Sequence, residues 1–247
     1  MSIAVPLTID DPERRAGRWA ALSGGVSVSA LIAALIAANS SAGSRVGGVP
    51  GRFAASHADR LRELASFHDS PSTQALAAGL RGLALVAGIG VGVYLYWMVR
   101  RRGAKVGRPV LWSAVVGPLL VAAATAFGFL AIRHVTDVFY ASGPQTAARA
   151  SDLVDHSSQL HLAGVFDVGS RIVFVVWVGV LSYHARRAEL LTTFLGYWGI
   201  GAAAAMVLLP VGDAMYVGWL ASLTLLAWGY WPGGLPEGWR RRPSETP

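Results

Sequence analysis

The stretch "FDVGSRIVFVVWVGVLSYHARR", residues 166–187, decides the fold class. Its middle is apolar and its end carries Arg186 and Arg187. This pattern predicts a membrane-spanning helix with a basic cytoplasmic flank, because a span needs about 20 mainly apolar residues. Asp167 and Arg171 stand near its start, and their spacing of four places both side chains on one helical face. An acid and a base inside a span call for an explanation.

The composition agrees with a chain that lies in a bilayer. Of its 247 residues, 53% are hydrophobic and only 14% are charged, with a mean hydropathy of +0.47. A soluble domain of this length needs more charge to cover its surface. The expected fold is all-α: one transmembrane helical bundle, a single domain over residues 1–247.

Several kinds of chemistry are excluded by the residue types. The chain has no cysteine, so disulfides, thiol catalysis and cysteine zinc sites are absent. Lys105 is the only lysine and lies in a basic loop, which excludes a Schiff base inside a helix. The net charge of +7 does not indicate nucleic-acid binding, because the arginines cluster at helix ends.

Six apolar stretches are long enough to span: Trp19–Ala38, Ala75–Val99, Val110–Ile132, Leu162–His184, Leu190–Pro210 and Ala214–Trp231. Arginine-rich groups precede the first, separate the second from the third and the fourth from the fifth, and follow the sixth. These groups lie on one side if all six spans exist, so both termini are expected in the cytoplasm. An alternative is a signal peptide cleaved near Ala38, which leaves five spans.

The two longer connections, residues 39–74 and 133–161, are expected on the outer side. In the first, Phe53, Leu61, Leu64 and Phe67 fall near one helical face. This spacing predicts a short amphipathic helix, either on the membrane surface or packed on the bundle.

Charged residues recur at one depth near the outer boundary. Asp167 lies 19 residues before Arg186, or about 28 Å of helix. Arg81 lies equally far before Arg100, and Asp137 and Asp213 occur in outer connections. The sharper interpretation is an outward polar vestibule for an anionic small molecule, lined by Arg81, Asp137, Asp167, Arg171 and Asp213. The alternatives are a simple ion pair on one helix with arginines that extend to the headgroups, or a subunit interface.

Two further sets of residues are candidates. His134, Asp152, His156 and His161 offer ligands for a divalent metal on the outer face, although ordinary solvated side chains explain them equally. Ala30, Ala34 and Ala38 form a small-residue ridge, which suits contact with another helix, a partner subunit or a second copy. Gly117 and Pro118 predict a kink in the third span.

Enzyme signatures are missing, so no catalytic residue is assigned and an enzyme is not favoured. The sequence has no H-E-x-x-H, G-x-S-x-G or P-loop motif. No cofactor is expected, because no facing histidine pair suits haem.

The arginine-rich leader, the six-span plan and the run "LRELASFHDSPSTQALAAGLRGLALVAG…YLYWMVRRR" resemble uncharacterised bacterial six-helix membrane proteins. This resemblance implies a bacterial plasma-membrane location and transfers no activity. The ridge at Ala30, Ala34 and Ala38 is also similar to that of substrate-capturing subunits of energy-coupling-factor transporters.

The expected function is therefore a small transporter, or a ligand-binding or accessory membrane subunit, with an outward polar vestibule. A structural or partner-binding component without a ligand is the alternative. A membrane enzyme or an outer-face metal site comes third.

Overall fold

The computed structural model describes residues 11–40, 56–208, 212–231 and 236, and all the regular structure within them is helical. Eight helices follow one another in this part of the chain: α1 (Asp11–Ser40), α2 (His57–Asp69), α3 (Pro71–Arg101), α4 (Arg108–Ala141), α5 (Ala147–Asp155), α6 (Ser158–Arg187), α7 (Thr193–Leu208) and α8 (Gly212–Ala227). The predicted all-α fold class is confirmed for these residues.

Four helices, α1, α3, α4 and α6, are long and apolar enough to cross a membrane, which indicates a membrane protein. The other two predicted spans coincide with α7 and α8, which have 16 residues each. Sixteen residues make about 24 Å of helix, less than the roughly 30 Å of a hydrocarbon core. Pro210, the predicted end of the fifth span, lies outside the described residues. Six spans therefore stay a prediction.

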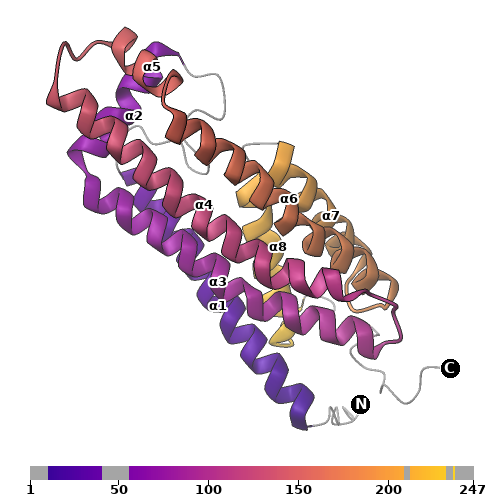
Figure 1. The fold of residues 1–247 in the computed structure, drawn as a ribbon. Helices are drawn as coiled ribbons and strands as arrows, with labels where there is room; N and C mark the ends of the chain where they lie inside the picture. The colour runs from indigo at the N-terminus through magenta and orange to yellow at the C-terminus, as the bar shows by residue number, and fades with distance from the viewer. Residues whose placement is uncertain (1–10, 41–55, 209–211, 232–235, 237–247) are drawn as a thin grey trace.

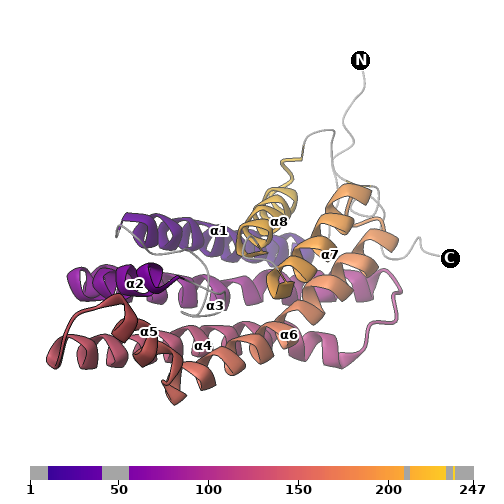
Figure 2. The same ribbon diagram turned by 90° about the horizontal axis from the view of Figure 1, so that it is seen from above.

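The six helices that correspond to the predicted spans form a closed ring. Each packs on the next in the order α1, α3, α4, α6, α7, α8, and α8 returns to α1. Figure 2 shows this order from above, with α3 between α1 and α4. Helices α7 and α8 are visibly shorter than α3, α4 and α6 in Figure 1.

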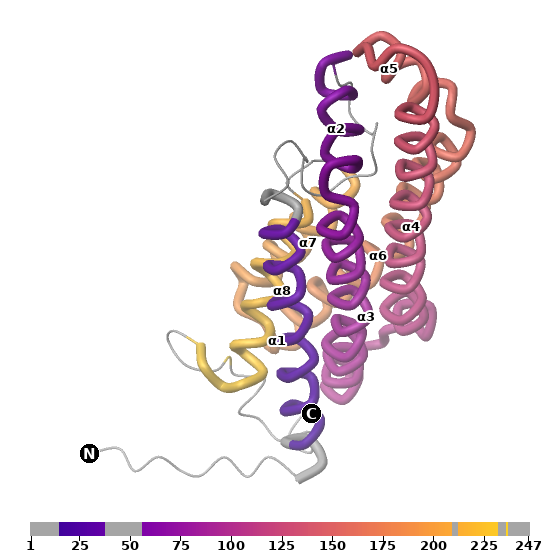
Figure 3. Tube along the Cα trace, turned by 90° about the vertical axis from the view of Figure 1, so that its left-hand side faces the viewer, coloured from indigo at the N-terminus to yellow at the C-terminus, as the bar shows by residue number. Residues whose placement is uncertain are grey.

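The other two helices, α2 and α5, sit together at one end of the bundle, which we call the α2–α5 end (Figure 3). The amphipathic helix predicted in the first outer connection is present as α2. It packs on the bundle: Leu64 is fully buried in a cluster with Ile132 and Phe139 of α4 and Val154 of α5. Phe53, part of the predicted apolar face, lies outside the described residues.

The second predicted outer connection, residues 133–161, is mostly helical. Helix α4 continues nine residues beyond its predicted end, because Ile132, Val135 and Phe139 keep an apolar face that α2 and α5 cover. It stops at Ala141, just before Gly143, whose φ of 75° suits glycine. Helix α6 starts at Ser158, where the Ser157 side chain accepts a hydrogen bond from the backbone N–H of Leu160.

The small-residue ridge of α1 faces the interior of the bundle. Ala30 and Ala34 are each 7% exposed, and Ala30 belongs to a core cluster with Ala84 of α3. One turn away, the hydroxyl of Ser27 donates to the backbone carbonyl of Ala84 at 2.6 Å. The side chain of Ala38 lies outside the described residues. Ala30 and Ala34 therefore pack against other helices of this chain, which is one of the contacts expected for the ridge, and contact with a partner subunit or a second copy stays a prediction.

Helices α4 and α6 approach closely at Gly117. A Cβ atom there would lie 2.6 Å from the Cα of Phe174, so only glycine fits without a shift. Pro118 follows within the helix. This contact fixes the position of α6, which carries Asp167 and Arg171.

Candidate functional site

Asp167 and Arg171 lie one turn apart on α6, and the ion pair predicted from their spacing is present. The Nε atom of Arg171 donates to both carboxylate oxygens of Asp167, at 3.0 and 2.9 Å. Both side chains are only 2% exposed. Ser170 also donates from its hydroxyl to the backbone carbonyl of Asp167, at 2.8 Å. Arg171 therefore points into the bundle and does not extend to lipid headgroups.

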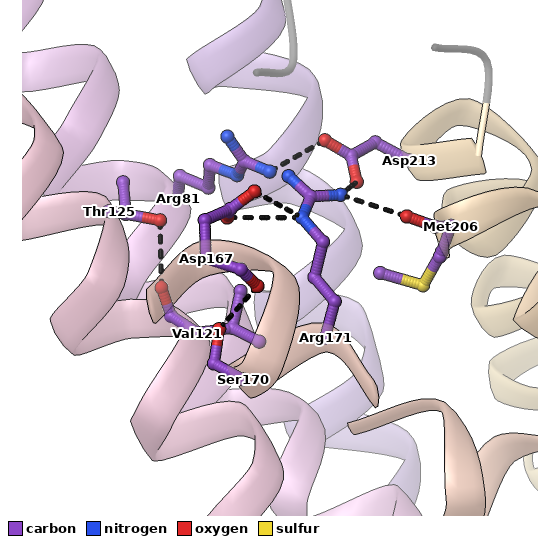
Figure 4. A network of polar contacts seen from close by, with 8 residues as sticks. All are labelled: Arg81, Val121, Thr125, Asp167, Ser170, Arg171, Met206 and Asp213. Carbon is purple, nitrogen blue, oxygen red and sulfur yellow. Dashed lines mark hydrogen bonds and ion pairs between the residues drawn. The ribbon is translucent and has the colours of Figure 1, made fainter. Parts of the chain in front are cut away.

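Asp213, the second residue of α8, connects this pair to α3. One of its carboxylate oxygens accepts a hydrogen bond from Nη1 of Arg171 at 3.1 Å, and the other accepts one from Nη2 of Arg81 at 2.7 Å. We call Arg81, Asp167, Arg171 and Asp213 the charge network. Figure 4 shows the carboxylate of Asp213 bound to both arginines.

Helix α7 contributes a backbone group to the same place. Nη1 of Arg171 donates to the carbonyl oxygen of Met206 at 3.3 Å. Met206 lies in the last turn of α7, where carbonyl groups lack partners within the helix. Arg171 thus joins α6 to both helices of the α7–α8 hairpin.

Solvent exposure changes across the charge network. The side chains of Arg81 and Asp213 are 18% and 16% exposed, whereas those of Asp167 and Arg171 are 2% exposed. The network therefore has an accessible rim formed by α3 and α8 and a sealed base formed by α6.

The charges within the network balance, with two arginines and two aspartates. Removing an ion from water costs several kcal/mol, and this cost is offset only by good geometry and additional hydrogen bonds. Arg171 meets that condition with two carboxylates and a carbonyl. Asp213 binds both arginines, and its negative charge offsets their mutual repulsion.

Asp137, the fifth predicted vestibule residue, does not join the network. It is exposed on α4, and Figure 4 shows Thr125 of the same helix beside the network. Twelve residues of helix separate Thr125 from Asp137, or about 18 Å along the axis. The prediction placed Asp137 in the outer connection after the third span, but α4 continues as a helix to Ala141 and carries Asp137 away from the network.

The four predicted metal ligands are not assembled. Asp152 of α5 and His156, which caps the end of that helix, form an exposed pair with 3.1 Å between carboxylate oxygen and ring nitrogen. His134 on α4 and His161 on α6 are exposed. Among the described residues, no group of three or more histidine or acidic side chains could hold a metal ion. Their positions on three different helices account for this.

An aromatic layer that sequence reasoning missed lies next to the charge network. Tyr216 and Phe174 each follow a network residue by three positions, and their rings are 5.1 Å apart. Trp177 and Trp219 continue the layer, with ring centroids separated by 5.9 Å. The position of Phe174 three residues after Arg171, and of Tyr216 three residues after Asp213, was the sequence pattern that could have predicted this layer. The Met206 carbonyl had no signal, because any residue type supplies one.

The site offers two guanidinium groups and two carboxylates, arranged from an accessible rim to a closed base. Such groups recognise small polar solutes through charge-assisted hydrogen bonds. No known protein family, curated protein or solved structure matches this chain.

Proposed function

We propose that this chain is a six-span protein of a bacterial plasma membrane with both termini in the cytoplasm. It acts as a small transporter, or as a ligand-binding or accessory membrane subunit. Its α2–α5 end faces outward and its charge network lines a polar vestibule for an anionic solute. Ionisable residues within membrane spans are costly and mark substrate and ion pathways.

The single observation that carries this proposal is the graded exposure of the network. Arg81 and Asp213 at the rim keep 18% and 16% of their side chains accessible, whereas Arg171 is 2% exposed. A small anion can reach Arg81 and compete with Asp213 for its guanidinium. Because Arg171 also binds Asp213, that competition changes the partner of the buried arginine.

The test is stabilisation of the purified protein in nanodiscs by small anions. Phosphate, sulfate and simple dicarboxylates are titrated while the thermal unfolding midpoint is measured, because a ligand that binds the folded state raises it with concentration. We expect saturable stabilisation by at least one anion class. Arg81→Ala should abolish it. Arg133→Ala, which removes an exposed arginine of α4 outside the network, should retain it. An effect insensitive to Arg81→Ala would refute the vestibule.

A second candidate function, a structural component without a ligand, is favoured by the charge balance. Asp213 is the only charged side chain among the described residues of α7 and α8, and it binds arginines on two other helices. In this case the network is a clamp for the hairpin. Asp213→Asn would then lower stability, while no anion would shift the midpoint of the wild-type protein.

A further inference from the structure

One end of the helix ring carries a concentrated positive charge. Here α1 begins, α3 ends, α4 begins and α6 ends, and Gly17 of α1 lies opposite Tyr94 of α3. The described side chains at this end include nine basic residues and one acid, Glu189. We call the nine the basic end: Arg15, Arg18, Arg100, Arg101, Arg102, Lys105, Arg108, Arg186 and Arg187.

The opposite end has no such excess. Its described side chains include six arginines, namely Arg60, Arg62, Arg81, Arg133, Arg149 and Arg171. They are accompanied by eight acids, namely Asp59, Glu63, Asp69, Asp137, Asp152, Asp155, Asp167 and Asp213. The net positive charge of the described side chains is therefore confined to the basic end.

The segments of the basic end converge in space. Val99 and Val106, on either side of the α3–α4 connection, belong to the same buried cluster as Ala185 and Leu190 at the end of α6. The arginines beside these residues therefore flank segments that pack into one core at the same end of the bundle.

Aromatic rings hold several of these arginines. The guanidinium carbon of Arg101 lies 3.5 Å from the ring centroid of Trp97, and that of Arg186 lies 4.8 Å from the ring centroid of Tyr197. Nη1 of Arg187 donates to the hydroxyl of Tyr183 at 3.2 Å. Tryptophan and tyrosine rings prefer the headgroup level of a bilayer, so these contacts place the guanidinium groups at that level.

Exposed aromatic side chains occur in the first two turns of the helices that start at this end. Trp112 near the start of α4 is 64% exposed, and Phe194 and Tyr197 at the start of α7 are 65% and 58% exposed. A free anion would leave these rings uncovered. A phospholipid covers them with its glycerol and acyl portion while its phosphate meets the arginines.

We propose that the basic end is a binding surface for anionic phospholipids, with Arg101 and Arg186 as its anchored contacts. Basic residues at a membrane surface attract anionic lipids, and arginine matches the geometry of phosphate. This inference does not depend on an anionic solute at the charge network: Arg81 lies 19 residues before Arg100 on α3 and Arg171 lies 15 residues before Arg186 on α6, or about 28 and 22 Å of helix.

The experiment compares lipid retention by two double variants that lose the same number of charges. The full-length protein is purified from vesicles of equal phosphatidylglycerol and phosphatidylcholine content, and the retained lipids are quantified by native mass spectrometry. We expect a several-fold enrichment of phosphatidylglycerol in the wild type. Arg101→Ala with Arg186→Ala should reduce it at least twofold, whereas Arg62→Ala with Arg133→Ala at the opposite end should not.

Two further arms complete the test. If the first variant does not fold, the double variant Lys105→Ala with Arg108→Ala replaces it, because both side chains are exposed. A twofold reduction of the phosphatidylglycerol enrichment in that variant supports the proposed surface. In a separate measurement, inorganic phosphate is added to the purified protein at increasing concentration and the retained lipid is quantified. Displacement of the lipid by millimolar phosphate, equal retention of both lipids, or equal loss in both double variants would overturn the proposal.

Discussion

At the scale of single residues, Arg171 explains why a membrane-spanning helix carries charge. Its guanidinium binds Asp167, Asp213 and the Met206 carbonyl, so its Nε and Nη1 atoms meet acceptors from α6, α7 and α8. A buried ion pair adds little net stability compared with apolar packing, but breaking one by removing a partner is costly. The network thus makes the positions of three helices depend on one side chain.

The first prediction concerns the two ways of altering this pair. Asp167→Ala leaves Arg171 buried with half of its compensating charge, and should lower the free energy of unfolding by about 3–5 kcal/mol. Asp167→Ala combined with Arg171→Ala removes the orphaned charge too, and should cost less than Asp167→Ala alone. Denaturant unfolding in mixed micelles measures both values. Asp137→Ala, an exposed acid outside the network, is the control and should change nothing. A double variant less stable than the single one would contradict the pairing.

The second prediction concerns Tyr216 in the aromatic layer. Its hydroxyl is buried and has no hydrogen-bond partner among the described residues, while its ring packs on Phe174. An unsatisfied buried hydroxyl costs about 1–3 kcal/mol, so Tyr216→Phe should stabilise the protein by about 1 kcal/mol. The same unfolding assay measures it. Tyr96→Phe is the control, because the Tyr96 hydroxyl accepts a hydrogen bond from Arg100; it should give no gain. A loss of stability in Tyr216→Phe would reveal a partner for the hydroxyl.

At the scale of helices, sequence reasoning succeeds where charge and hydropathy act locally. The ends of α3 and α6 at the basic end fall within three residues of the predicted Val99 and His184, because adjacent arginines stop both apolar runs. Sequence reasoning fails at the C-terminal end of α4. There the helix continues through Val135 and Phe139 because α2 and α5 cover these side chains. That contact joins residues distant in sequence, so no local sequence pattern predicts it.

The third prediction tests the close approach of α4 and α6. A methyl group at Gly117 would lie 2.6 Å from the Cα of Phe174 and 3.0 Å from its backbone nitrogen. Gly117→Ala should therefore force the helices apart and lower stability by about 1–3 kcal/mol. Gly169→Ala on α6 is the control, because nothing lies within 4 Å of its new methyl group. It should be neutral or stabilising by up to about 1 kcal/mol, since alanine favours helix. Equal effects of the two changes would argue against tight packing at Gly117.

At the scale of the whole molecule, the ring of six helices shows how far the candidate site followed from sequence. Counting residues from the arginine-rich helix ends placed Arg81 and Asp167 at one depth and Arg171 one helical turn nearer the cytoplasmic side, because helical rise is constant. Their mutual contacts depend on ring order, in which α8 brings Asp213 between α3 and α6. Asp137 was grouped with them because it follows the predicted end of the third span, and it lies elsewhere because α4 continues to Ala141.

The last prediction concerns the orientation of the whole molecule in the membrane. The positive charge at the basic end predicts that this end stays in the cytoplasm, because translocation of clustered arginine and lysine is disfavoured. The chain has no cysteine, so single cysteines report position without background. Ala148→Cys in α5 and Lys105→Cys in the α3–α4 connection are both at exposed positions. An impermeant thiol reagent added to intact cells should label Ala148→Cys strongly and Lys105→Cys only after the membrane is opened.

Two other labelling patterns would contradict this orientation. The two sites lie beyond opposite ends of α4, so the reverse pattern would show that the basic end faces outward and that the charge network faces the cytoplasm. Labelling of both sites in intact cells would show that α4 does not cross the membrane, and would remove the six-span arrangement together with the outward vestibule.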